Sequence, residues 1–310
     1  MKRFGVGVIG TGIMGRRMLV GLQRHARFRV AALWDARADA ARIASAEFGD
    51  ARCADSLDDL VNDPDVDIVY VASPPAFHLQ GVQAATAARR ACFCEKPLAH
   101  SVAEALAVRD LVAASALPFA VNFPLARAEA TRRLTDLVHG GSLGEIERVT
   151  LTMRFARWPR EWQAAASDWL AGPVEGGFTR EVISHFIFLA HRLFGAGSVE
   201  GAVLERAPGQ TETRLQARLV HDSATLLIDA AVGGDVADHN RFEIVGRRGS
   251  VALTSWYCVE YLGETSARVE PTSANLDGLA ALLEGRPDHG LASVDEALAV
   301  VRCVEAMLRP

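Results

Sequence analysis

Hydrophobic positions in the first third of the chain form short apolar runs separated by stretches with a helical period. The runs lie at residues 4–9, 29–34, 68–72, 91–94 and 119–121, and a further short strand is expected at residues 52–53. The helical stretches lie at residues 13–24, 38–48, 56–61, 77–88 and 101–115. Ser101 and Glu104 form a capping box at the start of the last helix. Strands that alternate with crossover helices predict a parallel sheet with helices on both faces.

The hydrophobic period changes in the second part of the chain. Between residues 147 and 155 apolar side chains occupy alternate positions, and between them lie Arg148, Thr150, Thr152 and Arg154. A period of two is typical of a half-buried strand. Further strand-like segments lie at residues 199–205, 214–220, 225–232, 241–246 and 251–256, with helices expected at 179–193 and 294–308. Runs of strands joined by short turns predict an antiparallel sheet.

These two patterns divide the chain near residue 120. The predicted fold class is α/β for residues 1–120, followed by an α+β domain with a large, mostly antiparallel open sheet for residues 121–310. The length of 310 residues agrees with two domains of ordinary size. We expect the last helix to pack back on the N-terminal domain.

Composition and charge argue against several classes of partner. The formal net charge is −5 and no long basic block is present, which argues against nucleic acid. No apolar run approaches the ~18 residues that cross a bilayer, and the first strand begins too early for a signal peptide. We therefore expect a cytoplasmic protein that does not enter membranes. The five cysteines are scattered and odd in number, and their surroundings predict neither a disulfide framework nor a metal site.

A glycine motif follows the first apolar run. Its residues are Gly10, Thr11, Gly12, Ile13, Met14 and Gly15. Between a strand and a helix, this G-x-G-x-x-G string predicts a Rossmann dinucleotide-binding domain. The first glycine permits a tight turn, the second lets backbone approach a pyrophosphate, and the third lets helix and strand pack closely. The helix N-terminus supplies free N–H groups for the phosphates.

Asp35 bears on the choice of cofactor. It ends the second strand, 20 residues after Gly15 (35 − 15), which is the spacing of a carboxylate that binds ribose hydroxyls. The alternative is an aspartate that caps the next helix. A carboxylate repels a 2′-phosphate, so NAD is the predicted cofactor. Arg37 keeps NADP open, because it either pairs with a 2′-phosphate or faces solvent.

Three further segments carry a resemblance to a known family. They are Ala72-Ser73-Pro74-Pro75 with His78, Glu95-Lys96-Pro97, and residues 176–185, in which Glu181 precedes His185 by four positions. With the glycine motif, they resemble the oxidoreductases grouped with glucose–fructose oxidoreductase and inositol 2-dehydrogenase, the Gfo/Idh/MocA family. The resemblance spans most of the chain and is weaker after about residue 195.

The resemblance implies roles for these residues. Lys96 would contact both substrate and cofactor, and His185 would be the acid/base at the reacting oxygen, with Glu181 at the family's carboxylate position. The strand exits would lie beside the nicotinamide end of the cofactor and bind it through Ala72, Ser73, Pro74, His78 and Glu95. The family also implies a homo-oligomer, a dimer or tetramer, formed through the second-domain sheet.

The residue chemistry supports hydride transfer between nicotinamide and a secondary alcohol or ketone. A histidine that titrates near neutrality suits the hydroxyl proton. Glu181 and His185 share a helix face, where a carboxylate can orient the imidazole, although such pairs are also common at surfaces. Lys96 can stabilise alkoxide character on the same oxygen. The expected small-molecule substrate is a sugar, cyclitol or related polyol.

Substrate contacts are predicted at three further residues. Trp162 is chosen from several tryptophans near residues 158–169, because indole faces stack on sugar rings; the alternative is that they fill a domain junction. Asn122 follows the strand at 119–121. Arg180 stands where the family is usually apolar, and Glu181 and Phe188 replace aspartates, which predicts a pocket unlike that of the sugar and cyclitol enzymes.

Other functions stay open at this point. A catalytically silent, dinucleotide-sensing regulator or binding subunit would use the same fold, although it would not need Lys96 and His185. A redox-neutral enzyme would keep NAD bound throughout, for glycoside cleavage or epimerisation. An imine or dihydrodiol dehydrogenase would fit the phenylalanine-rich segment 186–188.

Overall fold

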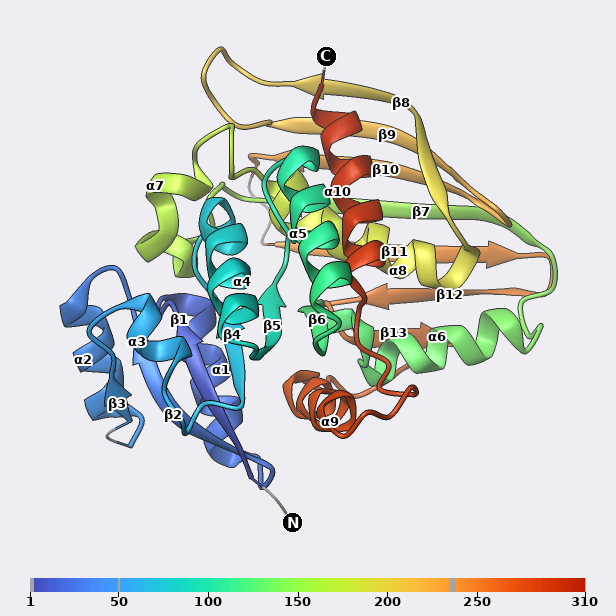
Figure 1. Cartoon of the computed structure of the whole chain (residues 1–310). Coiled ribbons are helices and arrows are strands. Elements are labelled where there is room, and N and C mark those ends of the chain that lie inside the picture. The colour runs from blue at the N-terminus through green and yellow to red at the C-terminus, as the bar shows by residue number, and fades with distance from the viewer. Residues whose placement is uncertain (1–2, 50, 235–237, 310) are drawn as a thin grey trace. The chain divides into compact units, whose positions relative to one another are not determined.

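The structure is a computed structural model that describes residues 3–49, 51–234 and 238–309. It divides into two compact units, drawn in Figure 1. Unit 1 comprises Met1–Phe123 and Thr272–Leu298, and unit 2 comprises Pro124–Pro271 and Ala299–Pro310. In the described part of the chain, no helix combines the length and the apolar character needed to cross a membrane.

Unit 1 is built on a six-stranded parallel sheet with the order β3-β2-β1-β4-β5-β6. Its strands are β1 (Phe4–Ile9), β2 (Phe28–Trp34), β3 (Arg52–Cys53), β4 (Ile68–Val71), β5 (Ala91–Glu95) and β6 (Phe119–Asn122). Its helices are α1 (Ile13–Arg24), α2 (Ala38–Glu47), α3 (Leu57–Val61), η1 (Pro75–Phe77), α4 (His78–Ala87), α5 (Val102–Ser115) and α9 (Thr272–Leu283). Every residue of β1, β4 and β5 is buried, as expected of strands covered on both faces. The predicted Rossmann domain is confirmed.

The helix α9 completes unit 1 from a distant part of the sequence. Leu276 and Leu279 of α9 join the core that also contains Leu19 of α1 and Phe28 of β2. This helix was not predicted, because its apolar residues lie close together and give no clear helical stripe. Its burial by tertiary packing explains why a weak local pattern forms a stable helix.

Unit 2 is built on an eight-stranded sheet with the order β14-β13-β12-β11-β7-β10-β9-β8 (Figure 1). Its strands are β7 (Ile146–Phe155), β8 (Gly197–Glu205), β9 (Arg214–His221), β10 (Thr225–Val232), β11 (His239–Gly246), β12 (Gly249–Thr254), β13 (Cys258–Tyr261) and β14 (Glu264–Thr265). All neighbouring strands are antiparallel except β7 and β10, which are parallel. The predicted large, mostly antiparallel sheet is therefore confirmed.

Apart from α9, the described helical segments after residue 123 are η2 (Pro124–Ala126), α6 (Glu129–His139), η3 (Glu161–Ala166), α7 (Ser167–Leu170), η4 (Thr179–Ile183), α8 (Ser184–Phe194) and α10 (Val294–Leu308). Prediction gave one helix over residues 179–193, whereas the first turn, η4, is a π-helix and α8 continues from it. On one face of the sheet Phe186 of α8 packs against Phe242 of β11, with ring centroids 6.1 Å apart. Val149 and Leu151 are fully buried, as the alternation in β7 predicted.

Candidate functional site

The carboxyl ends of three strands meet at one edge of the sheet in unit 1. In the strand order β3-β2-β1-β4-β5-β6, β2 and β3 follow on one side of β1, and β4 to β6 follow on the other side. The position between β1 and β4 is therefore the topological switch point, where ligands bind in such folds. Gly10 N–H donates to the Trp34 carbonyl at 2.8 Å, and Ala72 N–H donates to the Ile9 carbonyl at 2.8 Å. The glycine loop, the exit of β2 and the exit of β4 are thereby joined.

Two glycines of the motif are required by the protein's own packing. Gly10 has φ +91°, and a Cβ on it would lie 2.8 Å from the Ala72 carbonyl. A Cβ on Gly15 would overlap the Gly10 carbonyl oxygen. Gly12 differs, because a Cβ there would meet nothing within 4 Å. The open side of Gly12 leaves the backbone accessible to a ligand.

The N-terminus of α1 suits the phosphates of a dinucleotide. Gly12 is its N-cap, no side chain caps the helix, and no acidic residue lies in its first turn. The first N–H groups of such a helix carry partial positive charge, and they bind anions. Ile13 and Met14 are its first two residues, and Thr11 directly precedes the N-cap. The residues present therefore fit a pyrophosphate.

Asp35 ties the glycine loop to the end of β2. One carboxylate oxygen, Oδ2, accepts from Thr11 N–H at 2.8 Å and from Thr11 Oγ1 at 3.0 Å, while Oδ1 accepts from Arg37 N–H at 3.0 Å. A carboxylate has about four acceptor positions, so ribose hydroxyls can share it. The Arg37 side chain is 73% exposed and lies 3.9 Å from Asp35.

His78 joins the exits of β4 and β5. Its Nε2 lies 2.9 Å from the Ser73 carbonyl oxygen, and its Nδ1 lies 2.9 Å from the Pro97 carbonyl oxygen. The side chain is buried, with 1% exposure. Both ring nitrogens therefore face backbone of unit 1, and His78 holds the turn after Ala72, which contains Pro74, against the turn that contains Lys96. Its predicted contact with the cofactor stays a prediction.

Glu95 is the centre of a buried polar network below Lys96. Its Oε1 accepts from the Tyr70 hydroxyl and from Asn122 Nδ2 at 2.7 Å, and its Oε2 accepts from Lys96 N–H at 3.2 Å. Asn275 of α9 donates to Asn122 Oδ1 at 3.0 Å. Burial raises the pKa of Glu95, although the Tyr70 hydrogen bond and the Lys96 charge oppose that rise. This network fixes the backbone from which the Lys96 side chain extends.

Glu95 and Asn122, which were predicted to contact ligands, stabilise the fold of unit 1. The Glu95 carboxylate and the Asn122 carboxamide are 3% and 7% exposed, and their polar atoms are bonded within the network. The burial of Tyr70 beside Glu95 raises the pKa of its phenol. The roles predicted for Glu95 in cofactor binding and Asn122 in substrate binding stay predictions.

Glu181 and His185 lie together at the junction of η4 and α8 in unit 2. A π-turn at such a place is common near functional residues, and the spacing of four keeps both side chains on one face. His185 is 7% exposed, and its ring stands perpendicular to that of Trp256 with centroids 5.7 Å apart. Prediction missed Trp256, because nothing local in the sequence relates it to residue 185.

Glu212 holds the start of this helical segment. Its Oε1 accepts from Thr179 N–H at 2.6 Å, and the side chain is 3% exposed. Gly177, with φ +95°, has room for this carboxylate only because it lacks a Cβ. The buried carboxylate satisfies a helix N–H that would otherwise be unpaired, and it fixes the first turn of the segment that carries Glu181.

Arg180 points toward the C-terminal helix within unit 2. Its Nη2 donates to Glu305 of α10 at 2.6 Å, and its Nη1 donates to the carbonyls of Pro173 at 3.1 Å and Gly176 at 3.3 Å. The two charged side chains are 9% and 15% exposed. Arg180 therefore links η4 to α10, and its predicted substrate contact stays a prediction.

Trp162 is 45% exposed, and beneath it lies the guanidinium of Arg160, 4.7 Å from the ring centroid. Trp158 is instead held inside the unit, because its Nε1 donates to the Leu170 carbonyl at 3.1 Å. Of the three tryptophans between residues 158 and 169, Trp162 is the one predicted from the sequence to contact substrate, and that contact stays a prediction.

Within residues 3–49, 51–234 and 238–309, no cluster of three or more His, Cys, Asp or Glu side chains is arranged to hold a metal.

Two family models match the chain. Residues 4–123 match the model described as "Oxidoreductase family, NAD-binding Rossmann fold", and residues 131–252 match the "GFO/IDH/MocA C-terminal domain". The chain belongs to the Gfo/Idh/MocA oxidoreductase family. Its N-terminal segment is an NAD-binding Rossmann domain, and the family is one of NAD-dependent dehydrogenases.

Several named proteins are similar to the chain. It is 29% identical over 256 residues to an inositol 2-dehydrogenase of Acidothermus cellulolyticus, over 81% of this chain and 72% of the relative. It is 42% identical over 108 residues to an inositol 2-dehydrogenase of Gluconacetobacter diazotrophicus, over 34% of this chain and 32% of the relative. The structure of scyllo-inositol dehydrogenase from Lactobacillus casei, with NAD(H) and scyllo-inositol, matches with a TM-score of 0.81 at 18% identity, over 99% of this chain and 96% of that one. That structural likeness establishes the fold.

Proposed function

We propose that the protein is an NAD-dependent dehydrogenase or reductase that acts on a secondary alcohol or ketone of a sugar, cyclitol or related polyol. The observation that carries the proposal is the placement of Lys96. It directly follows β5 at the edge where the glycine loop lies, and its backbone is held by buried Glu95. The names of the relatives, among them inositol 2-dehydrogenases and a levoglucosan dehydrogenase, support this substrate class.

The chain's own residues divide the work of the proposed reaction. When bound, the nicotinamide supplies the hydride acceptor or donor. The His185 imidazole takes or returns the hydroxyl proton, and Glu181 orients that ring. The Lys96 ammonium hydrogen-bonds the reacting oxygen and stabilises its developing negative charge.

The test is the exchange of Lys96 for alanine. Lys96→Ala should lower turnover of a polyol by about 10²-fold or more, while NADH binding changes by less than about tenfold. His25→Ala is a matched control, because that side chain bonds Asp277 within unit 1. Unchanged turnover in Lys96→Ala would remove Lys96 from the mechanism. Tight NADH binding by the wild-type protein, without turnover across a broad panel of polyols, would instead favour a sensing protein.

For the cofactor, we propose NAD over NADP because the Asp35 carboxylate lies at the end of β2 beside the glycine loop. Asp35→Ser should raise the ratio of NADP to NAD affinity, because it removes the charge that repels a 2′-phosphate. Ser is chosen over Ala because its hydroxyl keeps an acceptor near Thr11. An unchanged ratio would leave Asp35 as a structural tie.

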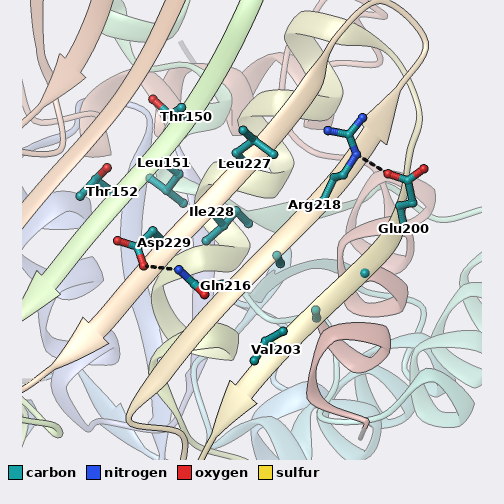
Figure 2. A pocket seen from close by; sticks show the side chains of 13 residues that line it. Thr150, Leu151, Thr152, Glu200, Val203, Gln216, Arg218, Leu227, Ile228 and Asp229 are labelled. Atoms are coloured by element: carbon teal, nitrogen blue, oxygen red, sulfur yellow. Dashed lines mark hydrogen bonds and ion pairs between the residues drawn. The ribbon is translucent and has the colours of Figure 1, made fainter.

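We further propose that a second copy of the chain covers the exposed face of the unit 2 sheet, giving a dimer or tetramer. This face carries an ion pair, Arg218 with Glu200, and a hydrogen bond from Gln216 to Asp229, around exposed Leu227 (Figure 2). Such paired polar groups suit a mixed interface. Leu227→Asp should shift the sedimentation coefficient toward that of a monomer, and a wild-type protein that sediments as a monomer would overturn the proposal.

A further inference from the structure

Arg160 lies at the centre of an aromatic cluster in unit 2. Its guanidinium carbon lies 4.7 Å from the ring centroid of Trp162, 5.7 Å from those of Trp158 and Trp256, and 5.8 Å from that of Phe155. All four distances are within the range of a cation–π interaction. We call these five residues the Arg160 cluster.

The guanidinium is held in place and largely removed from water. The Arg160 side chain is 11% exposed. Its Nε donates to Gln163 Oε1 at 3.0 Å, and Gln163 is itself 4% exposed. Its Nη1 lies 3.9 Å from Asp238 Oδ2. The aromatic faces add to the stabilisation of this charge, because cation–π attraction strengthens on desolvation.

The cluster reaches His185 through Trp256. The indole of Trp256 faces the Arg160 guanidinium and also meets the His185 ring at 90°. The backbone of Trp256 has φ +72°, which is rare for a bulky residue, and its N–H donates to buried Asn240 Oδ1 at 2.9 Å. One packed series of side chains thus runs from exposed Trp162, through Arg160 and Trp256, to His185.

We propose that Arg160 is a positioning residue that selects ring-shaped substrates. It braces Trp162 as a platform on which the C–H face of a cyclic polyol stacks, and it holds Trp256 against His185. An open-chain polyol has no flat C–H face and gains less from the platform. This inference rests on the proposed function and adds to it the preference for a cyclic over an open-chain substrate.

The variant Arg160→Met tests this role, since it keeps the length of the side chain but removes the cation. Arg157→Met is the matched control, because Arg157 lies in the same segment, is 63% exposed and pairs with Glu161 at 3.3 Å. KM and kcat are measured for myo-inositol and for D-sorbitol. In Arg160→Met we expect the KM for myo-inositol to rise about tenfold, the KM for sorbitol to change less, and the Kd of NADH to stay within about twofold.

A spectroscopic measurement makes the test independent of turnover. Acrylamide quenching of tryptophan fluorescence should increase in Arg160→Met and not in Arg157→Met, because the unbraced indoles move toward solvent. If wild-type protein turns over no polyol, the proposed function fails, while quenching still decides whether Arg160 organises the cluster. Equal quenching and an equal ratio of the two KM values in both variants would overturn the inference. Should Arg160→Met not fold, Trp256→Leu is measured against Trp169→Leu with the same two outcomes.

Discussion

The candidate sites of the two units are built by different means. At the sheet edge of unit 1, the surface that fits the cofactor is mainly backbone: the turn at Gly10, the open side of Gly12 and the uncapped start of α1. In unit 2, the surroundings of His185 are packed side chains, with Trp256 against the ring and Arg160 behind it. Unit 1 should therefore be most sensitive to an added Cβ, and unit 2 to the loss of a side chain.

One methyl group added at either of two glycines tests this difference between the units, and the largest effect is expected here. Gly15→Ala places a Cβ on the Gly10 carbonyl oxygen, so it should prevent normal folding of unit 1 or cost more than about 3 kcal/mol. Gly12→Ala meets no protein atom within 4 Å and should leave the urea midpoint nearly unchanged, yet weaken NADH binding. Urea unfolding and NADH titration measure both. Normal NADH affinity in Gly12→Ala would contradict the backbone site.

The next largest effect is expected from the charge pair of unit 2. Arg180→Met leaves the partly buried Glu305 without this partner and should lower the free energy of unfolding by about 3 kcal/mol. The double variant with Glu305→Met should recover much of that loss, because no unpaired charge is left. Urea unfolding gives the values. If Arg180→Met instead keeps its stability and raises the KM for substrate, the predicted substrate contact of Arg180 gains support over its structural role.

The two units also differ in how much the sequence predicts. The sheet of unit 1 follows from local signals, because β1, β4 and most of β5 are continuous apolar runs and the glycine motif marks the first turn. The helix α9 does not, since its apolar residues give no stripe and its burial depends on α1, some 250 residues earlier. Asn275 of α9 was missed for the same reason, although it completes the network at Glu95.

In unit 2 the strands were predicted and the contacts of the site were not. The alternation in β7 identifies its buried face from sequence alone. The π-turn at η4 has no periodic signal, and the helix α6 was missed. Glu212 and Trp256 are far from the His185 segment in sequence and contact it only in the folded protein. Side chains that meet across a fold leave no pattern in a single sequence.

The stability of the protein should depend on pH through Glu95 of unit 1. Burial raises its pKa in the folded protein above the ordinary value of 4.5. As pH rises above about 4.5, the unfolded chain releases this proton first, so folding becomes less favourable. The variant Glu95→Gln has no ionisable group at this position. The stability of wild type relative to Glu95→Gln should therefore fall as pH rises from 4 to 8, and a difference that is constant with pH would contradict the effect of burial.

The smallest effect, of opposite sign, is expected from His221 of unit 2. Burial lowers its pKa below the ordinary value of 6.5, where its ring packs against those of His191 and Phe194. As pH falls below 6.5, the unfolded chain binds a proton that the folded chain does not, so stability is lost on the acid side. His221→Phe keeps a ring in that place and removes the proton. The stability of wild type relative to His221→Phe should fall between pH 6.5 and pH 5 in urea unfolding. Glu95 lowers stability as pH rises, and His221 lowers it as pH falls. The double variant Glu95→Gln, His221→Phe should therefore lose both contributions to the pH dependence of the free energy of unfolding. If the contribution of Glu95 differs in the His221→Phe background, the two buried groups are coupled.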